Sequence, residues 1–351
     1  MNSIDANQDI ANQDVVLKVR NLVTSFRTDH GVVRALDGVG FQIRKGRTLG
    51  VVGESGCGKS VTSLSIMRLL PAGVGQIESG EVVFDGRDLV GVSEAEMCSL
   101  RGNRIAMIFQ EPMTALNPVF TAGEQIIEVF ETHRGMTRAQ ARSAALKMME
   151  LVRIPDPERR LDEYPHQMSG GMKQRVMIAM ALACEPALII ADEPTTALDV
   201  TIQSQILRLM QDLQRQTGTS IMFITHDLGV IAEVADDVVV MYAGQVVESS
   251  DVMTLFDKPL HPYTKGLMSS VPQSHQDRSK PLPTIKGSVP SLHDFPKGCR
   301  FAGRCPYRQQ KCIDQNPALT PAEDKHLVAC HFAREISEGK IKADNMGEHL
   351  R

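Results

Sequence analysis

A glycine-rich loop between an apolar strand and a helix constrains the fold of this chain more than any other feature. The run "GESGCGKS" (53–60) fits the phosphate-binding pattern G-x-x-x-x-G-K-[ST]. The apolar run "TLGVV" (48–52) precedes it, and a helix is predicted from Ser60. Glycines let the backbone curl so that its N–H groups converge on phosphate oxygens, and the helix N-terminus adds a positive dipole end. The motif therefore predicts an α/β fold that binds a nucleotide.

The side chains of this loop have distinct expected roles. Lys59 is expected to reach the β- and γ-phosphates, and the hydroxyl of Ser60 to bind Mg²⁺. Cys57 occupies a variable position of the pattern, where a small filler is expected. The predicted nucleotide contacts are Gly53, Glu54, Ser55, Gly56, Cys57, Gly58, Lys59, Ser60 and Val61.

Two more predicted strands end in polar residues that suit phosphate chemistry. The run "LIIADEP" (188–194) places Asp192 and Glu193 at the end of a buried strand. Asp192 is expected to bind Mg²⁺ through water. Glu193 is placed to polarise the attacking water as general base. The run "SIMFITHD" (220–227) repeats this arrangement and ends in His226, which is expected beside the γ-phosphate.

Composition narrows the class of protein. The chain has 351 residues, enough for two or three packed units, and 42% of them are hydrophobic. Its net charge of −4 argues against a broad nucleic-acid footprint. No run of 18 apolar residues is present, and the N-terminus has no basic region followed by an apolar one. We therefore expect a cytosolic protein that neither crosses a membrane nor is exported.

The run "MSGGMKQRV" (168–176) begins with poor helix formers and continues as a predicted helix. Together with the motifs above, in this order, it resembles the ABC ATPases, the nucleotide-binding subunits of ATP-binding-cassette transporters. "MSGGM" is similar to the signature motif of that family, usually Leu-Ser-Gly-Gly-Gln, and departs from it at Met168 and Met172. The resemblance implies that Ser169, Gly170, Gly171 and Met172 contact the ATP of a second subunit, so that ATP joins two head-to-tail cassettes.

The same resemblance assigns three further residues. Phe26, in "LVTSFRT", is similar to the aromatic residue that stacks on adenine. Gln110, in "MIFQEP", is similar to the Q-loop glutamine, which touches Mg²⁺ and transmits motion to a membrane partner. Asp199, in "TALD" (196–199), is similar to the D-loop aspartate that crosses the dimer interface. Core packing is the alternative for Phe26.

A finer resemblance links the chain to the ATPases of dipeptide and oligopeptide importers. It rests on "FQEPMTALNPVFTAGEQI" (109–126), "YPHQMSGGMKQRVMIAMAL" (164–182), "ADEPTTALDVTIQSQIL" (191–207), "HPYTKGL" (261–267) and "GSVPSL" (287–292). It implies ATP hydrolysis that powers solute import, at the cytoplasmic face of a bacterial inner membrane. The implied partners are two permeases, a homologous second ATPase and, indirectly, an extracytoplasmic binding protein. The alternative is a soluble ABC ATPase of DNA repair or translation.

The expected fold is a RecA-like core with an antiparallel β subdomain, an inserted helical subdomain and a C-terminal cysteine-rich extension. The boundaries follow from shifts in composition. They are a tail at 1–13, an ATPase domain at 14–257 with its helical subdomain at about 100–180, a cysteine-rich domain at 258–335 and a loose tail at 336–351.

Four of the seven cysteines lie in the C-terminal region, with spacings C-x5-C-x6-C-x17-C: Cys299, Cys305, Cys312 and Cys330. Four thiolates can hold a [4Fe–4S] cluster or zinc. The importer family with this spacing is linked to an iron–sulfur cluster, which favours that reading over zinc, a disulfide pair or incidental clustering. His293 and His331 are nearby alternative ligands, although both are expected to be ordinary core or surface histidines. Because residues 295–331 show little core of their own, we expect the cluster to be structural.

Overall fold

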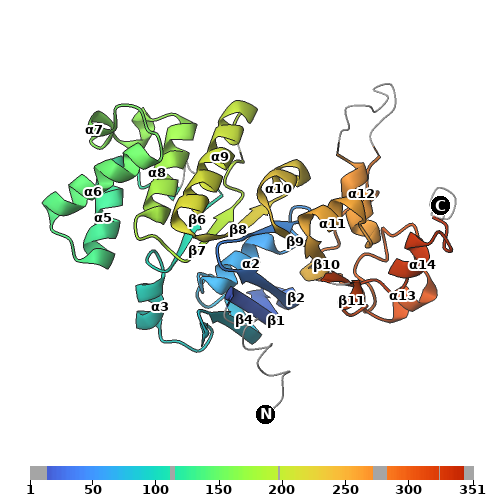
Figure 1. Cartoon of the computed structure of the whole chain (residues 1–351). Helices are drawn as coiled ribbons and strands as arrows, with labels where there is room; N and C mark the ends of the chain where they lie inside the picture. The colour runs from blue at the N-terminus through green and yellow to red at the C-terminus, as the bar shows by residue number, and fades with distance from the viewer. Residues whose placement is uncertain (1–13, 111–114, 197, 272–282, 324, 344–351) are drawn as a thin grey trace, which may run out of the picture. The chain divides into compact units, whose positions relative to one another are not determined.

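The computed structural model describes residues 14–110, 115–196, 198–271, 283–323 and 325–343 (Figure 1). The predicted tail 1–13, the end of the predicted C-terminal tail from 344, positions 111–114 of the run 109–126 and position 197 of the D-loop lie outside these ranges. The chain divides into two compact units, and each is described by itself. The first comprises Met1–Lys18, Gln42–Thr48 and Val82–Ile224, and the second comprises Val19–Phe41, Leu49–Glu81 and Thr225–Arg351.

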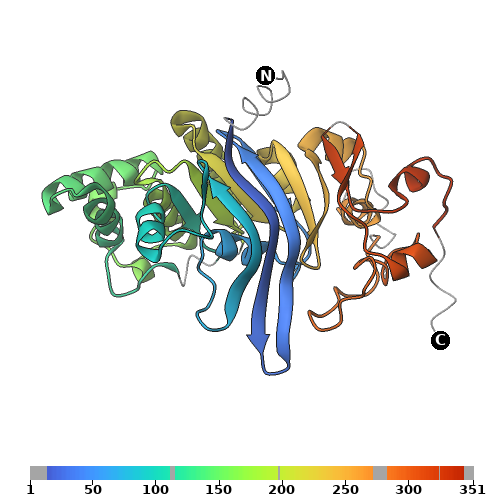
Figure 2. The same ribbon diagram turned by 90° about the horizontal axis from the view of Figure 1, so that it is seen from below.

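One sheet has four strands, in the order β2-β1-β4-β5 (Figure 2). Its strands are β1 (Val15–Thr28), β2 (Gly31–Arg44), β4 (Gly75–Phe84) and β5 (Arg87–Asp88). Only two residues separate β1 from β2, so these long strands form a hairpin. β4 and β5 pair antiparallel, with Phe84 opposite Arg87.

The first unit contains three neighbouring parallel strands, in the order β6-β7-β8. They are β6 (Ile105–Ile108), β7 (Leu188–Asp192) and β8 (Ser220–Thr225). Every residue of β7 and β8 is buried, which explains why the sequence of each is a continuous apolar run rather than an alternating one. The buried strands predicted within the runs 188–194 and 220–227 are confirmed.

Helices make up most of the rest of the first unit. They are α3 (Glu94–Leu100), α5 (Ala122–Arg134), α6 (Arg138–Leu151), α7 (Pro157–Arg160), the 3-10 turn Pro165–Gln167, α8 (Gly170–Leu182) and α9 (Val200–Thr217). α5, α6 and α8 pack on one another. α5 begins with a capping box, in which Thr121 and Glu124 each accept from the other's backbone N–H and so satisfy two donors of the helix end.

The second unit contains five strands in the order β11-β12-β10-β9-β3. They are β3 (Thr48–Val52), β9 (Asp237–Tyr242), β10 (Gln245–Asp251), β11 (Thr320–Glu323) and β12 (His326–Val328). β3 runs parallel to β9, and β9 and β10 form a hairpin through Ala243-Gly244. β12 pairs antiparallel with β10, so a strand from near the end of the chain joins this sheet.

Helices of the second unit are α2 (Lys59–Ile66), α10 (Leu228–Val234), α11 (Val252–Asp257), α12 (Pro262–Ser269), α13 (Gln310–Asp314) and α14 (Ala333–Ser337). α2 begins directly after the glycine-rich loop, as predicted. Among the residues that the structure describes, no helix combines the length and the apolar character that a membrane crossing requires.

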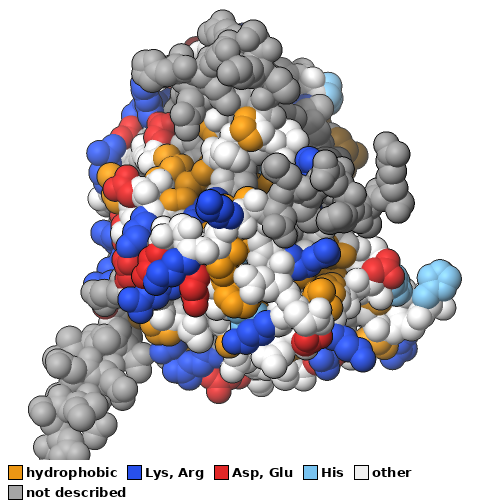
Figure 3. Space-filling view, turned by 90° about the vertical axis from the view of Figure 1, so that its right-hand side faces the viewer, with side chains coloured by type: hydrophobic (Ala, Val, Ile, Leu, Met, Phe, Trp, Pro, Cys, Tyr) orange, Lys and Arg blue, Asp and Glu red, His pale blue; other side chains and the backbone are white. Residues whose placement is uncertain are grey.

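The C-terminal region, which follows residue 257, contains more buried apolar packing than its sequence suggests, partly against β9. Phe301 is buried, and its ring lies 5.2 Å from that of Tyr242 and 5.4 Å from that of Tyr263, centroid to centroid. Leu260 packs with Val328 and with Ala333 of α14 in a second apolar cluster. On the face seen in Figure 3, hydrophobic side chains lie in small groups between charged side chains of both signs.

A buried carboxylate holds the C-terminal region to the hairpin. Glu248 of β10 is fully buried and accepts hydrogen bonds from the backbone N–H groups of Leu260 (2.6 Å) and His261 (2.9 Å). Nε2 of His326 lies 2.8 Å from the same carboxylate. Burial alone raises the pKa of Glu248, but the hydrogen bonds from His326 and from the two N–H groups outweigh it, so its pKa lies below the ordinary value.

Candidate nucleotide-binding site

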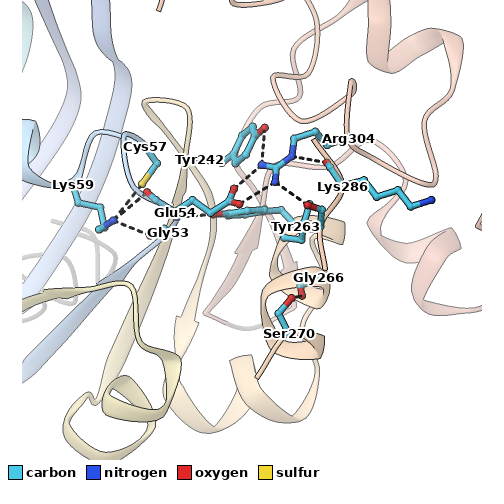
Figure 4. A network of polar contacts seen from close by, with 11 residues as sticks. Gly53, Glu54, Cys57, Lys59, Tyr242, Tyr263, Gly266, Ser270, Lys286 and Arg304 are labelled. Atoms are coloured by element: carbon cyan, nitrogen blue, oxygen red, sulfur yellow. Dashed lines mark hydrogen bonds and ion pairs between the residues drawn. The ribbon is translucent and has the colours of Figure 1, made fainter. Parts of the chain in front are cut away.

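The glycine-rich loop connects β3 to α2 and folds around the side chain of Lys59. The ammonium of Lys59 is buried and donates to the carbonyl oxygens of Gly53 (2.7 Å) and Glu54 (3.1 Å) (Figure 4). Sγ of Cys57 lies 3.9 Å from the same nitrogen. A positive charge is therefore fixed inside a loop whose backbone leads into the N-terminus of α2, an arrangement suited to an anion.

Two glycines of the loop are required by its geometry. Gly53 has φ +157°, and a Cβ there would lie 2.3 Å from the carbonyl oxygen of Met241. Gly58 has φ +102°, and its Cβ would lie 2.8 Å from Cδ2 of Leu36. L-residues rarely adopt such φ values, so a side chain at either position would be strained as well as crowded. These glycines let the loop pass close to β9 and β2.

Two residues of the C-terminal region contact the loop, and the sequence predicts neither contact. The hydroxyl of Tyr263 accepts a hydrogen bond from the backbone N–H of Glu54 (2.8 Å). The guanidinium of Arg304 makes two bonds to the Glu54 carboxylate, NH1 to Oε2 at 2.5 Å and NH2 to Oε1 at 2.9 Å (Figure 4). Arg304 and Glu54 are 250 residues apart, and neither belongs to a motif that links them.

The first unit places Gln110 beside Glu193, at the ends of neighbouring strands β6 and β7. Nε2 of Gln110 donates to Oε2 of Glu193 at 3.3 Å. The hydroxyl of Thr196 donates to the same oxygen at 2.9 Å, a contact that the sequence analysis did not predict. Glu193 has φ +47°, and its N–H donates to the carbonyl of Ile224 (2.9 Å). A non-glycine residue in this region stores strain, which is common at functional sites.

Asp192 is the last residue of β7, and its side chain is buried, with the residue 4% exposed. A buried carboxylate at a strand end is a hard oxygen donor of the kind that Mg²⁺ prefers. Lys59 and Ser60 belong to the second unit, whereas Asp192, Glu193 and Gln110 belong to the first.

The signature residues form the start of α8. Ser169 is the N-cap, and its hydroxyl accepts from the N–H of Met172 at 3.4 Å. A Cβ on Gly171 would lie 2.9 Å from Cγ2 of Ile202 in α9, whereas a Cβ on Gly170 would meet its nearest atom at 3.7 Å. Gly171 is therefore needed for packing between two helices of the same chain, a reason for glycine that is separate from phosphate contact.

The remaining predicted residues occupy different environments. Asp199 is the N-cap of α9 and accepts from the N–H of Ile202 (3.0 Å). His226 directly follows β8 and is exposed. Phe26 is half-buried in the second unit, and a Cβ on Gly75 would lie 3.0 Å from its ring. One side of the Phe26 ring is therefore packed against β4, in agreement with the alternative of core packing for that side.

The predicted iron–sulfur cluster is wrong, and so is its zinc alternative. Cys299, Cys305, Cys312 and Cys330 line one cavity, together with Phe301 and other apolar side chains. Nevertheless, within the described ranges no group of three or more His, Cys, Asp or Glu side chains has a geometry that could hold a metal ion. Burial raises the pKa of Cys305 and of Cys330 to about 12, so both thiols stay protonated. These cysteines behave as small apolar side chains of the C-terminal core.

Comparison with known proteins gives a consistent family. The ABC transporter family matches residues 36–196, and the oligopeptide/dipeptide transporter C-terminal region matches residues 247–312. A probable peptide ABC transporter ATP-binding protein of Sinorhizobium fredii is 56% identical over 92% of this chain and 96% of the relative. The oligopeptide transport ATP-binding protein AppD of Bacillus subtilis is 51% identical over 91% of this chain and 97% of the relative.

Solved structures agree with the fold. The ABC transporter cassette MJ0796, in a dimeric structure, is 29% identical, covers 67% of this chain and 98% of its own, and superposes with a TM-score of 0.60. CbiO1 of Clostridium perfringens, part of the ABC transporter complex cbiONQ, covers 70% of this chain with a TM-score of 0.60. The chain has the ABC ATPase cassette fold and belongs to the ATP-binding proteins of the ABC transporters, in the oligopeptide/dipeptide branch of that family.

Proposed function

We propose that the chain is the ATP-hydrolysing subunit of a bacterial ABC importer for dipeptides, oligopeptides or related small solutes. The observation that carries the proposal is the Lys59 ammonium, held by loop carbonyls between β3 and α2 where a nucleotide triphosphate would be bound. The peptide cargo is supported by the names of relatives that are 51–56% identical over nine-tenths of the chain. A soluble ABC ATPase of DNA repair or translation is not favoured by these relatives.

The roles proposed within one ATP site follow from residue chemistry. Backbone N–H groups from Gly53 to Val61 bind the phosphates, and Lys59 neutralises the β- and γ-phosphates. Ser60, Asp192 and Gln110 offer oxygen donors that suit Mg²⁺, which when bound would neutralise phosphate charge.

Glu193 polarises the attacking water in this proposal. The Gln110 amide and the Thr196 hydroxyl hold one of its carboxylate oxygens and so orient the side chain. His226 contacts the γ-phosphate, and Phe26 stacks on adenine with the ring face that is not packed on β4.

A second cassette completes the proposed reaction. Ser169, Gly170, Gly171 and Met172, at the N-terminus of α8, would contact the ATP of the partner, and Asp199 would cross the interface. A helix N-terminus with unpaired N–H groups favours an anion. The dimeric structure of MJ0796 supports a paired arrangement. ATP would then join two cassettes, and hydrolysis would release them.

We further propose the partners and the location of the subunit. Two permeases would span the inner membrane, a homologous second ATPase would pair with this chain, and an extracytoplasmic binding protein would deliver the solute. The chain would lie at the cytoplasmic face as a peripheral subunit, without nucleic acid as a partner. We also propose that the chain is divided into a tail (1–13), an ATPase domain (14–257), a cysteine-rich domain (258–335) and a second tail (336–351).

Affinity capture from the native cell tests the importer assignment. The tagged chain is purified from membranes in mild detergent, and a Lys59→Ala variant is captured in parallel to separate assembly from ATP binding. Two permeases and a second ATPase are the expected companions. Ribosomal or DNA-repair proteins in their place would overturn the importer assignment and leave ATP binding to be judged by ATP titration of the wild type and Lys59→Ala.

A further inference from the structure

Glu54 places a negative charge inside a loop that is proposed to bind a triphosphate. The backbone carbonyl oxygen of Glu54 accepts a hydrogen bond from the Lys59 ammonium (3.1 Å), so the Glu54 carboxylate is carried by a residue that Lys59 contacts. The charge of the Glu54 carboxylate affects the Cys57 thiol in the same loop. Burial raises the pKa of the Cys57 thiol, Lys59 lowers it, and the Glu54 carboxylate raises it further. Left uncompensated, this carboxylate would repel the phosphates of ATP.

Arg304 compensates the charge of Glu54. The arginine side chain is 6% exposed, and both of its terminal nitrogens bond to the carboxylate, the geometry of a strong ion pair. Nε of Arg304 donates to the carbonyl of Lys286 (3.0 Å), and NH1 lies 3.4 Å from the Tyr242 hydroxyl (Figure 4). The guanidinium is therefore held in one orientation before any nucleotide arrives.

Tyr263 fixes the backbone of the same residue. Its hydroxyl accepts from the N–H of Glu54, and its ring packs against Tyr242, with centroids 4.7 Å apart. The Gly53 carbonyl that receives the Lys59 ammonium belongs to the same peptide group as this N–H, and the Glu54 carbonyl belongs to the next one. The position of Lys59 therefore depends on a segment that the C-terminal region holds.

A second arginine of the same segment supports the loop indirectly. Arg300 bonds to the carbonyl of Ala243 and to the carboxylate of Asp37. Gly244, which follows Ala243 in the chain, donates its N–H to the carbonyl of Cys57 in the loop (2.9 Å). Two arginines four positions apart thus reach the loop by two routes, one direct and one through the β9–β10 turn.

We propose that Arg304 and Tyr263 are positioning residues for ATP binding: Arg304 cancels the charge of Glu54, and Tyr263 fixes the peptide that directs Lys59. The inference rests on the proposed function of the loop. It assigns the C-terminal region a direct part in nucleotide affinity. The competing explanation is that the ion pair acts only by anchoring the C-terminal region to the loop, in which case the loss of either partner would loosen the loop and weaken ATP binding.

The two explanations predict opposite results for one variant. Arg304→Gln leaves the Glu54 carboxylate without its positive partner, close to the loop proposed to bind the phosphates. This uncompensated negative charge should weaken ATP binding roughly three- to tenfold. Glu54→Gln removes the negative charge and leaves the arginine, so ATP should bind about two- to fivefold more tightly. The double variant has neither charge and should return to within about twofold of wild type.

The experiment titrates the purified full-length chain and its variants with a fluorescent ATP analogue and Mg²⁺, at low and high salt. Arg304→Lys is the conservative control. It keeps the charge but not the two-point contact, and it should bind within about threefold of wild type. Tyr263→Phe should also weaken binding, because the N–H of Glu54 loses its acceptor. The deficit of Arg304→Gln should shrink at high salt because salt screens the unpaired, partly exposed carboxylate.

Weaker binding in Glu54→Gln, with no recovery in the double variant, would overturn the inference and favour simple anchoring. Circular dichroism and thermal unfolding of each variant show whether it folds, and Arg304→Lys with Glu54→Gln carry the test if Arg304→Gln does not. Failure of the proposed function has a different signature, since wild type would then show no ATP binding that Lys59→Ala abolishes.

Discussion

Gln110 and Glu193 are 83 positions apart in the chain, yet the amide nitrogen of one lies 3.3 Å from a carboxylate oxygen of the other. The contact arises because β6 and β7 are parallel neighbours and each residue follows its strand closely. A residue proposed to transmit motion to a permease therefore touches the residue proposed to activate water. Any displacement of Gln110 would change the hydrogen bonding of that carboxylate.

Replacing Glu193 with Gln should slow ATP hydrolysis by about 10²–10⁴-fold, because the amide cannot accept a proton from water. ATP binding should be retained, so the variant should accumulate as an ATP-bound dimer. Phosphate release and size-exclusion chromatography with ATP measure the two effects. A wild-type rate of phosphate release would exclude Glu193 as the general base.

Thr196 should contribute to the orientation of Glu193. Thr196→Val keeps the shape of the side chain but removes the donor to Oε2, and we expect kcat to fall roughly three- to tenfold with little change in KM. Thr196→Ser keeps the hydroxyl and serves as the matched control. If the valine and serine variants had equal kcat, the hydrogen bond would have no part in the reaction.

The two signature glycines should respond differently to alanine. A Cβ on Gly171 would lie 2.9 Å from Ile202, whose branched side chain has little freedom to move away, so Gly171→Ala should destabilise the chain by about 1–3 kcal/mol. Gly170→Ala meets nothing closer than 3.7 Å and should be neutral or slightly stabilising, because alanine favours the helix. Urea unfolding of both variants compares them, and equal losses of stability would contradict the packing argument.

Glu248 should make stability depend on pH. Its pKa in the folded chain lies below the ordinary value of 4.5, so the unfolded chain binds its proton more readily as the pH falls. The stabilisation is complete above that ordinary value and is lost as the pH falls through the folded pKa. Unfolding free energies at pH 7 and across the acidic range measure this effect.

The matched control is Glu248→Gln, which cannot titrate. It should be less stable at pH 7 by roughly 1–3 kcal/mol, because the amide NH2 group is a donor and would face the N–H donors of Leu260 and His261. Its stability should also fall less than that of wild type on acidification. Parallel pH curves for the two proteins would show that another group is responsible.

The sequence predicts well those features that local patterns determine. The strand, loop and helix around residues 48–66 are predictable because apolar runs, glycines and Lys59 lie within one short segment. The strands ending at Asp192 and Thr225 are predictable for the same reason.

Contacts between distant segments are not predictable in this way. Arg304 reaches Glu54 across 250 positions, and no spacing rule joins them. The four cysteines show that a sequence spacing can also predict a site that the structure lacks. Their spacing suggests a metal cluster but does not fix the geometry of the side chains, which here line an apolar cavity. The role of Gly171 in packing against Ile202 likewise depends on how α8 meets α9.

The pairing of β12 with β10 has a consequence for how the chain is made. β10 ends at Asp251, whereas its outer neighbour begins at His326, so a growing chain leaves the ribosome with the edge of β10 open until almost all of it has been synthesised. An open edge is a template for pairing with other chains. A shortened protein that stops at the end of the proposed ATPase domain would keep this edge permanently, and Glu248 would lack its partners from Leu260, His261 and His326. Truncation in front of residue 258 is therefore expected to yield an aggregating product rather than a minimal ATPase.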